Sequence, residues 1–274
     1  MHIKDQIKAA EKLLSKFKMP ILPQAALDLQ KLFSDSEMPC PKKIKQLISI
    51  NPFLAGELVS LANLPSLSSS IDIRIKDIDG AIFRLGNHRL KNFIQSIYIK
   101  EMLSDFKIKG LSYHSQEIAL ISAEIARHNR TIRPDEAYLL GIVHDIGSFA
   151  LSELDESYGE TFVGKLVNHR DLEKHELSRY GTTHSALGYV IVRNWNMPAY
   201  IAQVTLLHHT HKISALKNNK LRNLIAIIEL AHALSILKKN NTPKSPEALE
   251  MYHECQEILG LTDEQLNDIR LRIN

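Results

Sequence analysis

The chain has 274 residues, 44% of them hydrophobic and 24% charged, a composition typical of a globular domain and not of a disordered or fibrous chain. Its 34 basic and 31 acidic residues nearly balance, so the overall charge does not indicate a nucleic-acid-binding protein. Two separated cysteines, Cys40 and Cys255, cannot form a disulfide framework and suit the reducing cytoplasm, where we expect the protein to reside.

No export or membrane segment is predicted. Residues 1–18 carry charged side chains throughout and have no apolar core of the kind found in secretory signals. The longest apolar run, Leu224–Leu237, covers fourteen residues and includes Glu229 and His232, whereas a membrane-spanning helix needs about 20 apolar residues. We therefore expect a buried core helix there and no contact with a membrane.

The first half of the chain has helical periodicity and almost none of the alternation typical of strands. The apolar spacing predicts a helix over 24–33, followed by two short helices over 41–50 and 52–61. A further helix over 78–85 is predicted to end at Gly86, because glycine is the preferred C-cap. The next predicted helix carries one broad apolar stripe, formed by Leu90, Phe93, Ile94, Ile97 and Tyr98.

The second half is predicted to hold longer helices after a linker at Lys107–Gly110. These helices are expected over 112–129, 134–146, 183–195, 198–209 and 221–238. The polar stretch 152–181 is predicted to form a solvated helix and a loop. The pattern as a whole predicts an all-α, multi-helix bundle divided into an N-terminal part, a second helical part and a C-terminal helical extension, over 1–109, 110–239 and 240–274.

Most of the histidines that could act as ligands or catalytic groups lie in short motifs within the predicted helices or at their ends. Seven residues of these motifs are candidate metal ligands: His114, His144, Asp145, His184, His208, His209 and His232. Imidazole and carboxylate groups suit divalent transition metals such as Fe, Mn, Ni and Zn. His144 and Asp145 are adjacent in the last turn of a predicted helix, where the free carbonyls favour a cation, and they are also the candidate catalytic pair.

The alternative for any single histidine is a hydrogen-bonded core or surface residue. We assign seven others to that group: His2, His88, His128, His169, His175, His211 and His253. His232, inside the most apolar helix, needs a partner because an unpaired buried polar group costs about 1–3 kcal/mol. Glu229, three residues earlier on the same face, is its predicted partner. No phosphate-binding glycine loop and no nucleophile elbow is present.

Several motifs in a fixed order carry a resemblance to a known family. Met19–Leu27 resembles an LPxLPxxA opening, Ile50–Asn63 resembles DPxL…LANS, and Ile78–Gly86 resembles SLxxAIxxLG. Tyr113–Ser115 and Trp195–Pro198 match an HS motif and a WNLP motif. With the pair at His144, these motifs make roughly residues 15–238 similar to the HDOD family, the HD-related output domain of bacterial signalling proteins.

The resemblance implies an all-α fold whose second half is similar to HD-superfamily metal phosphohydrolases, in a family regarded as regulatory and non-catalytic. It also implies His114, His144 and Asp145 as the residues that match the HD ligand pattern. The final aspartate of that pattern is His232 here, and Ser148 stands where a lysine often follows the motif. The Gly-Tyr-Pro motif of the diguanylate-hydrolysing branch is also missing. These changes remove a negative charge, a proton acceptor and a cation for phosphate.

We therefore expect a non-catalytic signal-transduction output protein that acts through protein or ligand binding, with a protein partner in a signalling pathway. The alternative is a metal-dependent phosphohydrolase, an HD-type phosphodiesterase acting on nucleotides or cyclic dinucleotides. A nucleic-acid-associated regulator is the third possibility. Only a modest basic stretch favours it, made of Arg84, Arg89, Lys91, Lys100, Lys107 and Lys109.

Overall fold

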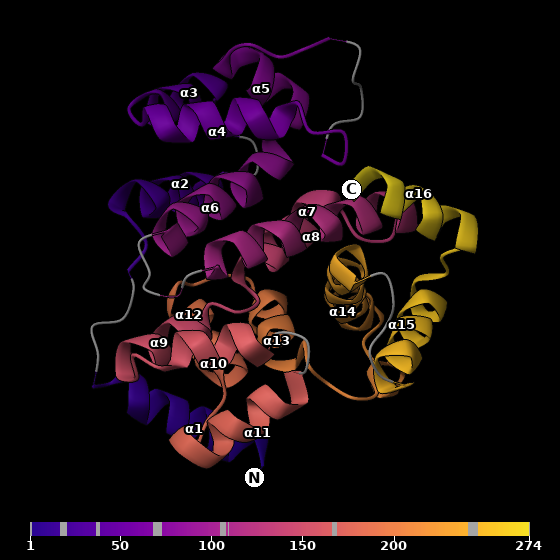
Figure 1. The fold of residues 1–274 in the computed structure, drawn as a ribbon. Coiled ribbons are helices and arrows are strands. Elements are labelled where there is room, and N and C mark those ends of the chain that lie inside the picture. Colours follow the sequence, from indigo (N-terminus) through magenta and orange to yellow (C-terminus); the bar gives the residue numbers. More distant parts are fainter. Residues whose placement is uncertain are drawn as a thin grey trace.

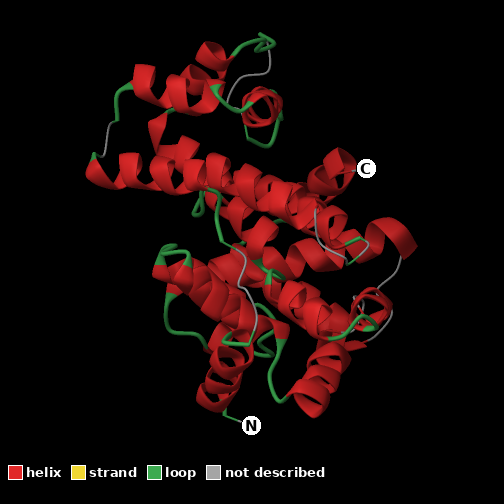
Figure 2. Ribbon diagram, turned by 90° about the vertical axis from the view of Figure 1, so that its left-hand side faces the viewer, coloured by secondary structure: helices red, strands yellow, loops and turns green. Residues whose placement is uncertain are grey.

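The computed structural model describes residues 2–16, 21–36, 39–67, 73–104, 108, 110–165, 169–240 and 246–273. These residues form helices and loops and contain no strand, which confirms the predicted all-α class (Figure 2). Lys107 and Lys109 of the predicted linker, and Met19 of the opening motif, lie outside the described residues. Within the described residues, no helix combines the length and apolar character that a bilayer-spanning segment requires.

The early helices form the upper part of the molecule in Figure 1. They are α2 (Gln24–Asp35), α3 (Pro41–Ser49), α4 (Pro52–Ala62), α5 (Ile78–Leu85) and α6 (Asn87–Ser104). Proline begins α3 and α4, and the Asn51 side chain caps α4 by accepting a hydrogen bond from the Leu54 N–H. Gly86 ends α5 with a φ of 71°, as predicted for a glycine at this position.

The middle and lower parts of the molecule hold the next helices. They are α7 (Leu111–Asn129), α8 (Pro134–Val143), α9 (Gly147–Leu154), α10 (Tyr158–Lys165), α11 (His169–Tyr180), α12 (His184–Asn194) and α13 (Ala199–Leu207). A 3₁₀ turn, η1 (Ile213–Ala215), leads to α14 (Asn219–Asn240), α15 (Pro246–Leu259) and α16 (Asp263–Ile273). In Figure 1, α14, α15 and α16 lie on the right of the molecule.

The first helix, α1 (Ile3–Leu14), packs against α12, far along the chain, rather than against α2. The hydroxyl of Thr182, just before α12, donates a hydrogen bond to the carbonyl oxygen of Gln6 at 2.9 Å. At the other end of the chain, α15 packs on α14 and α16 packs on α7. Both terminal segments therefore lie against the second half of the protein.

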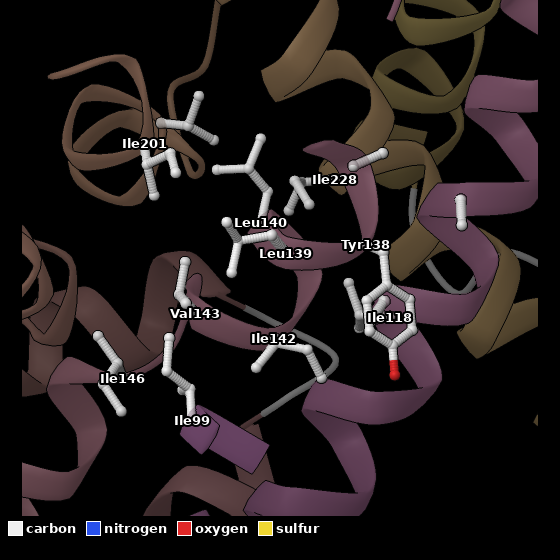
Figure 3. Close-up of a cluster of buried hydrophobic side chains, with 14 of the residues drawn as sticks. Ile99, Ile118, Tyr138, Leu139, Leu140, Ile142, Val143, Ile146, Ile201 and Ile228 are labelled. Carbon is white, nitrogen blue, oxygen red and sulfur yellow. The ribbon is translucent and has the colours of Figure 1, made fainter. Parts of the chain in front are cut away.

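Helix α8 runs through the centre of the core. Every residue of Ala137–Val143 is buried, which is the pattern of a helix covered on all sides. Its neighbours contribute Ile99 from α6, Ile118 from α7, Ile201 from α13 and Ile228 from α14 (Figure 3). Because α8 is held from all sides, the residues directly after it are placed rigidly with respect to four other helices.

Close contact between α7 and α8 depends on Gly141. A Cβ at this position would stand 2.3 Å from the Cα of Ala119, far inside van der Waals contact. The absence of a side chain therefore lets the two backbones meet, and it brings the end of α8 beside the start of α7.

The structure corrects two of the predicted elements. The helix predicted over 134–146 ends at Val143, and a separate helix, α9, begins at Gly147. The stretch 152–181, predicted as a solvated helix and a loop, forms α10 and α11, and it buries Tyr158, Phe162 and Glu176 completely. The many charged residues of this stretch predicted exposure to solvent. Most of them lie on the outer faces of the two helices, and fewer, mainly apolar residues form an inner face that packs against the core.

Candidate metal centre

The structure brings together all seven sequence-predicted site residues, although they come from five separate stretches of chain. Three lie within helices or at a helix start: His114 on α7, His184 as the first residue of α12, and His232 on α14. His144 caps the C-terminal end of α8, and His208 caps that of α13. The list is completed by Asp145 and His209, each directly after one of these caps.

The Asp145 carboxylate lies at the middle of the cluster. Its Oδ2 is 3.4 Å from Nε2 of His114 and 3.0 Å from Nε2 of His144. Its Oδ1 is 3.3 Å from Nε2 of His184 and 3.3 Å from Nε2 of His208. One carboxylate therefore has a separate pair of imidazole nitrogens at each of its two oxygens.

The seven residues divide into two sets that share Asp145. The first set is His114, His144, Asp145 and His232, and the second is Asp145, His184, His208 and His209. Within each set, one ligand atom from every residue lies within 4.8 Å of the others, close enough to surround one ion. In the first set, Nε2 of His232 lies 3.2 Å from Nε2 of His144.

Backbone carbonyls orient two of the rings. Nδ1 of His144 lies 2.8 Å from the carbonyl oxygen of Gly141, and Nδ1 of His208 lies 2.8 Å from that of Thr205. A carbonyl oxygen can only accept a hydrogen bond, so Nδ1 carries the proton in both rings. Their Nε2 atoms, which face Asp145, are therefore the nitrogens left to bind a metal, and each can do so once it carries no proton.

Carboxylates orient two further rings in the same way. Nδ1 of His184 donates to Glu176 at 2.9 Å, and the Tyr158 hydroxyl donates to the same carboxylate at 2.6 Å. Nδ1 of His209 donates to Oε1 of Glu229 at 3.1 Å. The predicted partnership of Glu229 with His232 is thus wrong as a hydrogen bond, because Nδ1 of His232 lies 3.9 Å away and the carboxyl faces His209.

Burial and charge set the protonation of the cluster. Burial acts to raise the pKa of Asp145, but the charge of His144 and the polar contacts of His114, His144 and His184 outweigh it and hold the pKa well below the ordinary value. Burial lowers the pKa values of His208, His209 and His232, so these rings are neutral. Asp145 is therefore an ionised carboxylate among rings that can act as ligands.

Two other groups, the His184 ring and the Glu229 carboxyl, have raised pKa values. Burial opposes charge on His184, yet Glu176 and Asp145 raise the pKa of this imidazole well above its ordinary value. Burial, followed by repulsion from Glu173 and Asp145, raises the pKa of Glu229 to about 8. His184 is therefore the ring that has to lose a proton from Nε2 before that nitrogen can bind a metal.

The chemistry of the donor set fits a divalent metal ion. Among the described side chains, several buried atoms find no hydrogen-bond partner, and four of these belong to residues of the cluster: Nε2 of His114, Oδ1 of Asp145, Nε2 of His208 and Nδ1 of His232. A buried polar atom without a partner costs about 1–3 kcal/mol. Three of the four are ligand atoms that converge on the centre, where a cation would satisfy them.

Sequence reasoning missed one histidine of this region. His169, assigned to the ordinary histidines, begins α11, and its ring centroid lies 4.3 Å from that of His209 and 4.7 Å from that of His232. No motif surrounds it, so only the packing of α11 could reveal its place. By contrast His128, also assigned to the ordinary group, is hydrogen-bonded as expected, with Nε2 3.3 Å from a Glu124 oxygen.

An all-α fold with a His-Asp pair at the middle of a buried histidine cluster defines an HD-related helical protein. This chain belongs to the HDOD family, because the sequence model of the HDOD domain matches residues 19–211. The expected resemblance is therefore confirmed. The match ends before His232, which the tertiary structure adds to the cluster. No curated protein sequence matches the chain.

Solved structures share the fold. An HDOD domain protein of unknown function from Geobacter sulfurreducens has 20% identity and a TM-score of 0.68, covering 99% of this chain and 98% of the other. A protein provisionally named a phosphohydrolase, from Shewanella amazonensis SB2B, has 19% identity and a TM-score of 0.70, covering 97% and 93%. A protein provisionally assigned to signal transduction, from Marinobacter aquaeolei VT8, has 17% identity and a TM-score of 0.63, covering 99% and 64%.

Proposed function

We propose that this chain is a non-catalytic signal-transduction output protein, built around a buried metal centre, that acts by binding a protein or ligand partner. The observation that carries the proposal is the single Asp145 carboxylate, enclosed by six imidazoles whose nitrogens converge on it. Four of the rings are oriented by outer hydrogen bonds, an arrangement typical of metal sites. We infer that the ion holds the helices of the second half in one arrangement.

The donor set favours some metals over others. Six imidazoles and one carboxylate form a nitrogen-rich set, which suits Fe, Ni, Zn and, less strongly, Mn, and which does not suit Mg or Ca. A bound ion would supply a Lewis acid to this pocket. The chain's own contribution is to orient the rings and to keep the pocket dry, since His144, His184 and His208 are 0% exposed.

Three features weigh against hydrolysis. The centre is buried: six of its seven residues have 6% or less of their surface accessible, and His209 is partly exposed. His232 supplies a neutral nitrogen where the phosphohydrolase pattern has a carboxylate able to accept a proton from water. Ser148 is fully buried, with its hydroxyl 3.3 Å from that of Tyr158, so its position offers no cation to a phosphate.

A metal-dependent phosphohydrolase is the second candidate, and one observation favours it. The two ligand sets share Asp145, and two ions bound side by side are the arrangement that many phosphate-cleaving enzymes use. The catalytic pair would then be His144 and Asp145, and the substrate would be a nucleotide or a cyclic dinucleotide.

One experiment separates the two candidates. Protein purified without a chelator is analysed for metal and then assayed for hydrolysis of bis(p-nitrophenyl) phosphate and of cyclic dinucleotides, with added Mn or Ni. We expect about one or two ions per chain and no turnover. Turnover that disappears in His144→Ala would replace this proposal with the phosphohydrolase. A chain that takes up no metal would contradict both.

A further inference from the structure

His169 lies at the edge of the metal centre and belongs to neither ligand set. Its ring stacks on His209 at an interplanar angle of 18°, with the centroids 4.3 Å apart, and lies 4.7 Å from the ring of His232. Rings within the ligand sets are separated by similar distances, 4.9 Å for His144 and His232 and 5.5 Å for His184 and His208. His169 is therefore as close to the centre's rings as those rings are to one another.

The position of His169 bridges the two sets. His209 belongs to the set around His184, whereas His232 belongs to the set around His114. The rings of His209 and His232 lie 6.0 Å apart, and the His169 ring is closer to each of them than they are to each other. The His169 imidazole thus lies across the gap between the rings of His209 and His232.

Helix α11 holds His169 in this place. Glu176, seven residues later and so on the same helix face, accepts hydrogen bonds from both the backbone N–H and Nδ1 of His184 at 2.9 Å. Leu172, between them on that face, is 1% exposed. The Ser185 hydroxyl also donates to Glu173 at 3.1 Å, so α11 is fastened to the start of α12 at two points.

His169 also lies at the solvent-facing edge of the centre. The residue is partly exposed, as is His209, whereas the remaining six residues of the ligand sets are buried. A metal site that reacts with external molecules keeps one coordination position open to them, whereas a closed site fills it with protein.

We propose that His169 is the residue that closes the metal centre, by covering the side from which a small anion or water would reach the ion. The inference rests on the proposed metal centre and names how access to it is controlled. The covering is steric: the bulk of the ring excludes the external ligand. An anion such as azide or inorganic phosphate is the chemical class that the opened site would accept, because it would bind a divalent cation flanked by only one carboxylate.

The test loads wild-type, His169→Ala, His169→Phe and His175→Ala proteins with Co(II) and titrates each with azide, following the absorption bands of the ion. His175, on the same helix, is the matched control for loss of a histidine from α11. We expect azide to change the spectrum of His169→Ala at a concentration at least about tenfold lower than for wild type, a difference of about 1.4 kcal/mol. His169→Phe and His175→Ala should stay closed, as wild type does.

The outcomes are distinguishable. If wild type takes up no Co(II), the proposed metal centre fails, and the closing role of His169 falls with it. If wild type binds Co(II) and its spectrum responds to azide as readily as that of His169→Ala, the centre stands and the closing role is overturned. The same conclusion follows if folded His169→Phe is as open as His169→Ala, because bulk then does not close the site. Circular dichroism and Co(II) stoichiometry establish that each variant is folded and loaded.

Discussion

The backbone of Gly147 lies directly against that of His184. A Cβ built on Gly147 would stand 1.9 Å from the carbonyl oxygen of His184, far closer than any side chain tolerates. Gly147 begins α9 and His184 begins α12, so this contact places the turn that carries Asp145 beside the first residue of α12. Half of the metal centre depends on this approach of two backbones.

We expect Gly147→Ala to destabilise the protein by about 3 kcal/mol or more, because the added methyl group meets backbone atoms that cannot rotate away. The measurement is urea unfolding followed by circular dichroism. Gly56→Ala is the matched control, since a Cβ on Gly56, in the middle of α4, meets nothing within 4 Å. The control should unfold at the same or higher urea concentration, because alanine favours a helix by about 0.5–1 kcal/mol over glycine. Equal losses in the two variants would contradict the argument.

Asp145→Asn should abolish metal binding in both ligand sets. The amide keeps the size of the carboxylate but loses the only negative charge among the ligands. We expect its metal content, measured by elemental analysis, to fall below about a tenth of that of wild type. His114→Ala, which alters one set, should keep the ion bound by His184, His208 and His209. Asp79→Asn, an exposed carboxylate paired with Lys45, controls for loss of charge and should leave the metal content unchanged.

Metal should stabilise the folded chain strongly. An ion that binds only the folded state at 100 times its Kd adds about 2.7 kcal/mol, which corresponds to a rise in Tm of about 5 °C or more for a domain of this size. The measurement is thermal unfolding of chelator-treated protein with added Ni, Zn or Mg. Ni and Zn should raise Tm and Mg should not, because the set is rich in nitrogen. An equal response to all three ions would mean that the binding site lies elsewhere.

The metal-free protein should lose stability as the pH falls below about 6.5. Burial lowers the pKa values of His208, His209 and His232, and it lowers that of His169 to about 3. The unfolded chain takes up protons at these rings below its ordinary pKa of about 6.5, and the folded chain does not. Stability is therefore present above that pH and lost on acidification, by up to about 1.4 kcal/mol per pH unit for each ring.

Two variants check this assignment by unfolding in urea between pH 5 and 8. His209→Gln removes one of the shifted rings, so it should make the loss of stability on acidification shallower. Glu229 contributes to the pH dependence of stability with the opposite sign. Its raised pKa of about 8 stabilises the folded chain at low pH, and this stabilisation is lost as the pH rises through that value. Glu229→Gln should therefore make the acid loss steeper. If both variants changed the acid loss of stability in the same direction, the directions of the pKa shifts given to His209 and Glu229 would be wrong.

His232→Asp should change which metal the centre prefers. A carboxylate in place of an imidazole makes the first ligand set harder and more negative, so Mn gains relative to Ni. We expect the ratio of the two dissociation constants to shift towards Mn by about tenfold, or about 1.4 kcal/mol. Competition titrations with a metal indicator measure the ratio. His88→Asp adds the same charge on an exposed histidine of α6 and should leave the ratio as it is in wild type.

Local sequence signals determined the all-α class, most helix boundaries and the seven members of the cluster. Periodicity and capping are properties of neighbouring residues, so α5 with its Gly86 cap and α12 with its Thr183 cap were predictable one element at a time. The cluster residues stood out because adjacent histidines and a His-Asp pair at helix ends are uncommon. None of this required knowledge of how the helices pack.

Only the tertiary structure decided which side chains orient and cover the centre. Glu176 lies in a charge-rich stretch that reads as solvated, and its contact with His184 exists because α11 folds back onto α12. His169 reaches the centre by the same packing, and Glu229 bonds His209 instead of His232 because α13 ends beside α14. Partners such as these are chosen by the distances between helices far apart in sequence, and local periodicity carries no information about those distances.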